Sequence, residues 1–285
     1  MADRIISRLF GGAGNQLFQY AAGRALADHL GCDLVLDSRY VAGSADRGDC
    51  FAHFANARFR RDANLPPAKS DGALRYGLWR KFGRDPRFHR ESGLGFDPGF
   101  FDLPPNIYLH GYWQSQKYFE TIAEQLREDL RFTTELNAAN AALAAEIASA
   151  DTPVALHVRR GDYVASGSYA ACSPAYYRAA ADLLSAELGR SLTCFVISND
   201  PAWARDNLDL GQETVFVDLN DETTGHFDLH LMTLCAHNVI ANSTFSWWGA
   251  WLNAHPGQLV VAPKDWFATD ALNNPDICPE DWLRL

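Results

Sequence analysis

The sequence contains no long apolar run, because Arg, Asp or His interrupts every stretch that approaches the length of a membrane span. Its first residues, Met1-Ala2-Asp3-Arg4, lack the apolar stretch of a signal peptide. Basic residues are in deficit, since 25 Lys and Arg stand against 35 Asp and Glu, a formal net charge of -10. Nucleic acid is therefore not an expected partner, because its binding needs a basic field that replaces phosphate counterions. We expect a cytoplasmic protein, which leaves room for peripheral contact with the inner face of the membrane.

Metal-binding patterns are also missing. No two of the six cysteines have CxxC spacing, which disfavours zinc and thioredoxin-like sites and favours buried free thiols. No Asp-x-Asp motif is present that would hold a divalent cation on a nucleotide. His226, Asp228 and His230 alternate, but on a helix Asp228 points away from the two histidines. We therefore expect no metal and no cofactor.

The length of 285 residues suits two domains of ordinary size. The first half begins as β-α-β and then becomes irregular between residues 42 and 105, where we expect loops and short helices. We place the domain boundary at Asp151-Thr152-Pro153, between 1–150 and 151–285. The elements expected in the first domain are strands at Arg4–Phe10, Cys32–Leu36 and Asn106–His110 and helices at Asn15–Leu30, Tyr118–Phe132 and Leu136–Ala150.

Strands alternate with helices in the second half, which predicts a parallel sheet. The expected strands are Val154–Val158, Thr193–Ile197, Thr214–Val217, Asn238–Ala241 and Leu259–Ala262, and the expected helices are Pro174–Leu188, Phe227–Ala236 and Trp247–Leu252. Ligands of such sheets bind at the carboxyl ends of the strands. Polar clusters follow several of these strands, so we expect the binding site there.

One such cluster runs from His157 to Asp162, as His-Val-Arg-Arg-Gly-Asp. Two adjacent arginines in an extended segment point to opposite sides. One of them can grip a phosphate with its planar fork, while the other pairs with Asp162 or another acid. Taken alone, the cluster is equally compatible with a solvated charged turn.

A second cluster, Asn242-Ser243-Thr244-Phe245-Ser246-Trp247-Trp248-Gly249, also follows a strand. Its hydroxyl residues can cap a helix, and free N–H groups at the start of that helix can bind a phosphate. Capping alone is the more common meaning of such a pattern.

A third cluster, Gly11-Gly12-Ala13-Gly14-Asn15-Gln16, lies between a strand and a helix. It matches a dinucleotide-binding fingerprint in part, and Asp37 stands at about the distance of a ribose-binding acid. This supports an NAD-dependent oxidoreductase as an alternative. Against that alternative, Leu17 occupies the third glycine position and the arginine pair has no evident use.

Five segments together resemble the α-1,2-fucosyltransferases of bacteria and animals, and they span nearly the whole chain in the family's order. They are GGAGNQLFQYA at 11–21, GYWQSQKYF at 111–119, HVRRGDY at 157–163, SND at 198–200 and NSTFSWWGAWL at 242–252. The resemblance implies a GT-B architecture of two Rossmann-like domains facing across a cleft. It also implies transfer of fucose from GDP-fucose, a substrate, to the 2-hydroxyl of a galactose-terminated oligosaccharide or glycan precursor, with inversion and without metal.

The resemblance also implies roles for individual residues. Arg159 resembles the arginine that neutralises the leaving diphosphate, and Asn15 matches a cleft residue near the donor, so both are counted as catalytic. The second domain would bind the donor and the first the acceptor. The implied donor-binding residues are Gly12, Gly14, His157, Arg159, Asn199, Asp200, Ser243, Thr244 and Phe245, and the implied acceptor-binding residues are Tyr112, Trp113, Gln114 and Lys117.

The catalytic base is less well specified. Wider relatives supply a carboxylate shortly after the arginine pair, but no Asp or Glu lies between Tyr163 and Ala181. Asp162 is therefore the candidate, either as the base or as a partner of Arg160 that holds Arg159 in position. A non-catalytic sugar- or nucleotide-binding protein of the same fold remains a further alternative.

Overall fold

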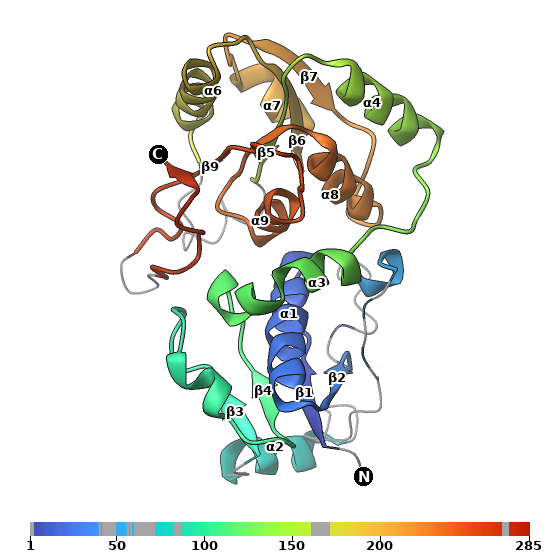
Figure 1. Ribbon diagram of the computed structural model, residues 1–285, viewed down its shortest axis with the longest axis vertical. Coiled ribbons are helices and arrows are strands. Elements are labelled where there is room, and N and C mark those ends of the chain that lie inside the picture. The colour runs from blue at the N-terminus through green and yellow to red at the C-terminus, as the bar shows by residue number, and fades with distance from the viewer. Residues whose placement is uncertain are drawn as a thin grey trace. The chain divides into compact units, whose positions relative to one another are not determined.

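The chain folds into two compact α/β units, which a computed structural model describes for most of the sequence (Figure 1). Unit 1 comprises Met1–Arg131 and Pro275–Ile277, and unit 2 comprises Phe132–Asn274 and Cys278–Leu285. None of the described helices is both long and apolar enough to cross a lipid bilayer. The described residues are 3–39, 41, 50–55, 57, 59, 72–82 (without the side chains of 79–82), 87–160, 172–269 and 274–285.

Unit 1 is built on a four-stranded parallel sheet with the order β2-β1-β4-β3. Its long helix α1 follows β1 and covers one face of the sheet. The elements are β1 (Arg4–Arg8), α1 (Ala13–Leu30), β2 (Asp33–Asp37), the 3-10 turn η1 (Cys50–His53), α2 (Ala73–Phe82), β3 (Phe88–Arg90), η3 (Pro98–Asp102), β4 (Tyr108–His110), η4 (Gln116–Tyr118), η5 (Glu120–Ile122) and α3 (Ala123–Asp129).

Unit 2 contains a six-stranded sheet with the order β10-β9-β8-β5-β6-β7, in which every pairing is parallel. Its elements are α4 (Ala138–Ser149), β5 (Pro153–Val158), α6 (Pro174–Leu188), β6 (Thr193–Ser198), α7 (Pro201–Asn207), β7 (Glu213–Val217), α8 (Gly225–Leu234), β8 (His237–Val239), α9 (Thr244–Trp251), β9 (Val260–Ala262) and β10 (Leu283–Arg284). The expected alternation of strands and helices in a parallel sheet is thus confirmed.

Helices cover both faces of the unit 2 sheet. Successive residues of a strand point to opposite faces, so Val154, Leu156 and Val158 of β5 alternate with Ala155 and His157. The first three residues share a core with α6 and α7, whereas Ala155 shares a core with α4 and α8. The sheet is therefore buried on both sides, as its near-continuous apolar strands require.

The units meet in the chain at residues 131 and 132, ahead of the boundary at 150 and 151 that the sequence predicts. Helix α4 lies between these two positions. Leu143 and Ile147 of α4 pack in one core with Ala155 of β5 and Leu231 of α8. The apolar face of α4 is therefore buried within unit 2, and the helix belongs to that unit.

Some elements differ from the sequence-based expectation. Strand β3 forms in the stretch between 42 and 105, where only loops and short helices are expected, because three residues are too few to show a strand period. The short helix α2 agrees with that expectation. The helix expected at Tyr118–Phe132 is shorter, since α3 covers Ala123–Asp129 and two 3-10 turns precede it. The last helix begins at Thr244, three residues earlier than expected.

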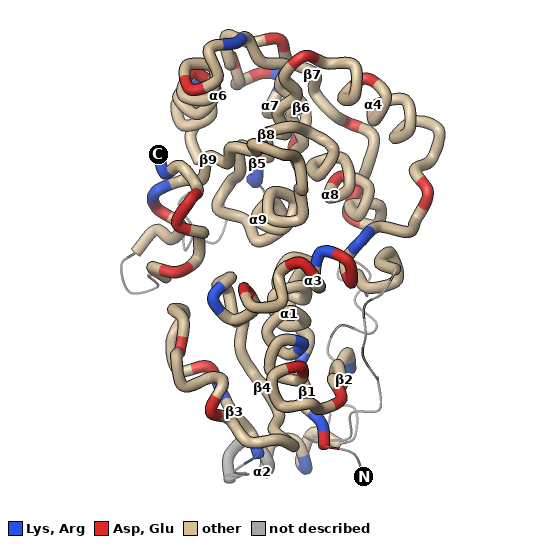
Figure 2. The backbone as a smooth tube through the Cα atoms, viewed as in Figure 1, with Lys and Arg blue, Asp and Glu red and all other residues tan. Residues whose placement is uncertain are grey.

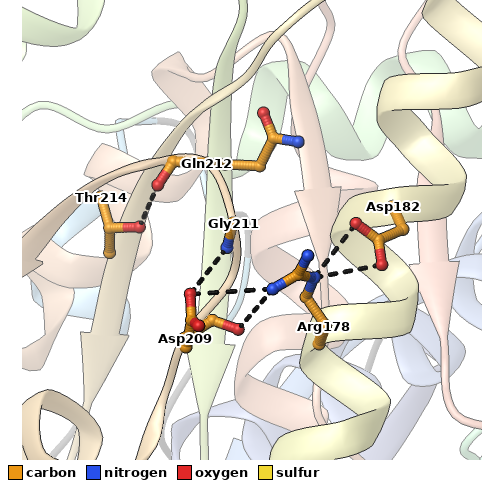
Figure 3. Close-up of polar contacts among 6 residues, drawn as sticks. All are labelled: Arg178, Asp182, Asp209, Gly211, Gln212 and Thr214. Atoms are coloured by element: carbon orange, nitrogen blue, oxygen red, sulfur yellow. Dashed lines mark hydrogen bonds and ion pairs between the residues drawn. The ribbon is translucent and has the colours of Figure 1, made fainter.

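A polar network ties α6 to the loop between α7 and β7 (Figure 3). Arg178 donates Nε–H to both carboxylate oxygens of Asp182, at 3.1 and 3.2 Å, and its Nη1 lies 3.7 Å from Asp209 Oδ1. The Gly211 N–H also donates to Asp209 Oδ1, at 3.1 Å. Gly211 has a φ of 61°, and a Cβ added there would lie 2.6 Å from the Arg178 guanidinium. A side chain at 211 would therefore strain the turn and displace the arginine.

Close contact between α1 and the unit 1 sheet depends on Gly23. A Cβ added at Gly23 would lie 2.9 Å from Ser7 Cβ of β1 and 3.0 Å from Leu34 Cδ1 of β2. The Ser7 hydroxyl donates to the Gln19 carbonyl at 2.7 Å, so this strand and helix are also joined by a buried hydrogen bond. The helix cannot retreat from an added methyl group without weakening both contacts.

We predict that Gly23→Ala destabilises the protein by about 1–2 kcal/mol, because overpacking outweighs the gain in helix propensity. Gly77→Ala is the matched control, since Gly77 is also helical but a Cβ there meets nothing within 4 Å. Urea unfolding followed by circular dichroism measures both variants. A Gly23→Ala midpoint equal to or above that of wild type would show that the helix and sheet accommodate the methyl group.

Candidate functional site

The carboxyl edge of the unit 2 sheet contains a topological switch point between β5 and β8. From β5 the chain continues through β6 to β7 on one side, and from β8 it continues through β9 to β10 on the other. Ligands of open α/β sheets bind in the crevice at such a point. His157 and Arg159 lie at the end of β5, and Ser243 starts α9 after β8. The structure thus brings the first and second clusters of the sequence, 157–162 and 242–249, to the ends of neighbouring strands.

His157 is buried at this point, with 4% of its surface exposed. Its ring lies 5.6 Å from the ring of Phe245 in the first turn of α9. Burial, together with the nearby Arg159 guanidinium, lowers the pKa of His157 to about 3. Nδ1 has no hydrogen-bond partner among the described residues. The imidazole is therefore neutral near pH 7 and has polar capacity to offer a ligand.

The two adjacent arginines take different directions, as the sequence predicts. The Arg160 guanidinium lies 3.7 Å from the centre of the Trp203 ring on α7, and its backbone N–H donates to Asn199 Oδ1 at 2.9 Å. Arg159 lies close enough to His157 to lower the pKa of that histidine. Strand alternation puts Arg159 on the same side as His157, whose ring faces Phe245 of α9, whereas Arg160 packs on α7.

The residues after β6 mainly organise the next helix. Asp200 Oδ1 accepts the Trp203 N–H at 3.1 Å and so caps α7, while the Asp200 N–H donates to Ser198 Oγ at 2.9 Å. Asn199 is exposed and fixes the backbone of Arg160. A local role therefore accounts for the type of residue found at both 199 and 200.

Helix α9 points its N-terminus at the same crevice. Ser243 is buried and precedes the helix, but its hydroxyl does not cap it. The first turn of any helix has N–H groups without an intrahelical partner, and the helix dipole adds positive potential there. Thr244 and Phe245, in this first turn, are partly exposed. The start of α9 is thus suited to an anion.

In unit 1 the glycine-rich turn between β1 and α1 contacts the 111–118 segment. Gly11 has a φ of 79°, and Gly12 precedes α1 in an extended conformation. Gly14 and Asn15 lie in the first turn of the helix. Asn15 Oδ1 accepts the Gln114 side-chain N–H at 2.9 Å. The structure therefore joins two segments that the sequence assigns to donor and acceptor sides.

The remaining acceptor-side residues divide into exposed and engaged ones. Tyr112 is 37% exposed and packs its ring 4.9 Å from that of Phe10. Trp113 is 1% exposed and lies within the core of unit 1. Lys117 Nζ donates to Asp276 Oδ1 at 2.6 Å. The tryptophan therefore packs in the core and the lysine forms an ion pair, and neither contact is evident from the motif alone.

Charged residues that the sequence analysis did not single out gather at the carboxyl edge of the unit 1 sheet. Arg8, Arg90 and His110 end β1, β3 and β4. Arg8 Nη1 lies 2.8 Å from His110 Nδ1, and the His110 ring stacks on Phe10 at 5.4 Å. Burial and the two arginines lower the pKa of His110 to about 4. This edge combines flat rings with cationic side chains. A sequence prediction of β3 would have placed Arg90 at a strand end and so indicated this edge.

Glu91, directly after β3, was also missed. Its Oε2 accepts the Tyr112 N–H at 2.6 Å and its Oε1 accepts the Trp113 N–H at 2.9 Å. Burial raises the pKa of Glu91, and the two backbone hydrogen bonds oppose that shift. Trp113 has a φ of 56°, which is uncommon for a residue with a side chain. Glu91 therefore holds the loop that presents Tyr112.

Two surface cavities, of about 570 and 670 Å³, lie at the opposite, amino edge of the unit 2 sheet. They surround the residues at which β5, β6 and β8 begin, including Pro153, Thr193 and His237. The sequence clusters do not line them. The two cavities are therefore separate from the strand-end clusters.

Two further sequence predictions concern Asp162 and metal. Asp162 lies outside the described residues. Within the described part of the chain, no three His, Cys, Asp or Glu side chains gather as metal ligands. His230 instead stacks on Phe132 at 4.5 Å, and Asp228 accepts the Asn220 side-chain N–H at 2.6 Å.

The fold matches solved glycosyltransferases. The structure of NodZ alpha-1,6-fucosyltransferase soaked with GDP-fucose aligns with a TM-score of 0.52 at 16% identity, over 88% of this chain and 93% of that one. This confirms the α/β fold class of GT-B type. At this identity the likeness shows the fold.

Sequence relatives identify the family. The model described as "Glycosyl transferase family 11" matches residues 94–285. The chain belongs to this family, and the resemblance to fucosyltransferases is confirmed. It is 30% identical to an alpha-1,2-colitosyltransferase of Escherichia coli, over 99% of this chain and 98% of the relative. It is 29% identical to human galactoside alpha-(1,2)-fucosyltransferase 1, over 52% of this chain and 43% of that protein.

We predict that His157 makes the protein less stable in acid. In the unfolded chain its pKa is near 6.5, whereas in the folded chain it is about 3. The unfolded state therefore binds more protons between these values, and stability falls as pH drops below 6.5, by up to about 1.4 kcal/mol per pH unit. Urea midpoints of wild type and His157→Leu between pH 7 and pH 5 measure this. Equal pH dependence in both proteins would contradict the assignment.

Proposed function

We propose that the protein transfers L-fucose from GDP-fucose to the 2-hydroxyl of a galactoside, with inversion and without a metal ion. The proposal rests on one observation above all. At the switch point of unit 2, Arg159, neutral His157 and the N-terminus of α9 meet at adjacent strand ends. Cationic and N–H groups of this kind stabilise a leaving diphosphate.

The charge changes of the reaction account for these groups. As the bond between C1 of fucose and the phosphate oxygen breaks, positive charge develops on the sugar ring and negative charge on GDP. The planar fork of Arg159 and the N–H groups that begin α9 would take up the negative charge. The acceptor hydroxyl would attack C1 from the opposite face, which inverts the anomeric centre.

Residues next to the diphosphate site would bind the guanosine. Neutral His157 and the Phe245 ring offer a polar atom beside a flat apolar face. Asn199 and Asp200 lie at the end of the adjacent strand β6, where Asp200 Oδ1 already caps α7 and Oδ2 is left for a ligand. Ser243 and Thr244 would contact the phosphates from the start of α9.

The acceptor would contact unit 1. Exposed Tyr112 beside Phe10, with Arg8, Arg90 and His110 at the strand ends, offers ring faces and donors for a galactoside. Gly12, Gly14 and Asn15 would approach the donor from the start of α1. Asp162 remains the candidate base. Alternatively, it positions the arginines, and the acceptor proton leaves late for water or a phosphate oxygen.

A second donor is favoured by one comparison. One relative that aligns over almost the whole chain is named for transfer of colitose rather than fucose. Colitose is fucose without its 3-hydroxyl, so the two GDP-sugars differ at a single position of the ring. A site that hydrogen-bonds the 3-hydroxyl would reject colitose strongly, whereas an apolar site would not.

We predict that the purified chain, in excess EDTA, converts GDP-fucose and a β-galactoside to an α-1,2-linked product identified by NMR. GDP-colitose and NAD, tested beside it, address the other donor and the oxidoreductase alternative. Product only from GDP-colitose would change the donor. Product only after manganese or magnesium is added would refute metal independence. Binding of GDP without any product would indicate a non-catalytic binding protein.

We also predict that Arg159→Lys lowers turnover by about 3–4 kcal/mol in activation free energy, on the order of 10²- to 10³-fold. Lysine keeps the charge but cannot make the forked contact with the diphosphate. Arg160→Lys is the matched control, because its guanidinium stacks on Trp203 and a lysine there retains a cation over the ring. Similar losses in the two variants would assign the leaving-group role to the pair rather than to Arg159.

A further inference from the structure

Helix α2 presents large apolar side chains to solvent. Leu74 is 79% exposed and Leu78 is 52% exposed. Four residues apart on a helix, they lie on the same face. Tyr76, on the other side of the helix, is only partly exposed. The outward face of α2 is thus apolar, and in most soluble helices that face is polar.

The same segment is basic in an acidic protein. Residues 73–87 contain five Lys or Arg and one Asp, a net charge of +4, whereas the whole chain has a net charge of -10. Acidic positions lie on α3, α4, α6 and α8 (Figure 2), but α2 contains none. Arg75 and Arg87 are exposed among the described side chains. The exposed leucines therefore belong to a segment that is basic in sequence, with Arg75 exposed next to Leu74.

Exposed leucines together with basic residues fit one partner chemistry well. A helix with apolar residues on one face and Lys or Arg around it lies in the interface of a bilayer, where leucines enter the boundary between headgroups and acyl chains. Anionic headgroups attract the basic residues, which adds to the apolar contribution. A protein partner could also cover exposed leucines, but it would not in general need the excess of positive charge in this segment.

We propose that the exposed leucines of α2, together with Arg75 and Arg87, dock the protein on an anionic lipid bilayer. In Figure 1, α2 lies at the level of the N-terminus, where β1 begins, whereas Arg8, Arg90 and His110 lie at the opposite, carboxyl ends of their strands. Docking through α2 therefore leaves the carboxyl edge of the unit 1 sheet accessible. This surface does not depend on which sugar the protein transfers.

Vesicle sedimentation tests the proposal without any enzymatic readout. The full chain should bind phosphatidylcholine vesicles that contain phosphatidylglycerol, bind pure phosphatidylcholine much more weakly, and lose binding as salt increases. Leu78→Glu and Leu74→Gln should each weaken binding by about tenfold or more, the second without any change in charge. Arg75→Gln should weaken binding to the anionic vesicles only.

Leu219→Glu is the matched control, because Leu219 in unit 2 is 46% exposed and lies outside α2. It adds the same charge as Leu78→Glu and should leave vesicle binding unchanged. Equal effects of Leu78→Glu and Leu219→Glu, or no binding by the full chain, would overturn the proposal. A dimer that light scattering detects and that Leu78→Glu dissociates would also overturn the proposal, if neither the wild type nor the variant binds vesicles. Transfer to a soluble galactoside should be the same in Leu78→Glu and wild type.

Discussion

The packing of α9 determines where the candidate site can be. Trp247, Trp248 and Trp251 are almost fully buried, and their rings lie 5.0 to 6.1 Å apart, with Trp282 5.4 Å from Trp247. Such large rings tolerate few arrangements, so the axis of the helix is fixed by its core contacts. The N–H groups at its start are consequently held beside the end of β5 before any ligand arrives. Preorganised donors of this kind are effective because they need no rearrangement when charge develops.

Much of the architecture was predictable because the deciding signals are local. Buried apolar strands followed by Arg159, Asn199 and Ser243 mark strand ends, and parallel strands bring such ends to one edge. The family resemblance then rests on short segments whose order and spacing are specific. The predicted helix start is three residues later than Thr244, because a helix that is buried on all sides after its first two residues shows no apolar periodicity by which its start can be found.

The missed features depend on contacts between distant parts of the chain. Glu91 accepts hydrogen bonds from the backbone of Tyr112 and Trp113, about twenty residues away in the sequence. No local sequence pattern predicts such a contact. Trp113 has the sequence context of an acceptor residue, but its ring is in the core. The alanine-rich sequence of α4 is compatible with either unit, so only the packing of the helix shows that it belongs to unit 2. The arrangement around Asp162 lies outside the described residues, and its role remains a proposal.

The short segment Pro275–Ile277 has a consequence for building hybrid proteins. It belongs to unit 1 although its neighbours in the chain belong to unit 2, and Asp276 accepts the Lys117 ammonium and the Phe96 N–H. The chain therefore passes between the units three times rather than once. A chimera joined at residue 131 would combine Lys117 from one parent with position 276 from the other. Exchange of unit 1 among relatives would thus require the transplanted unit to carry its own 275–277 segment.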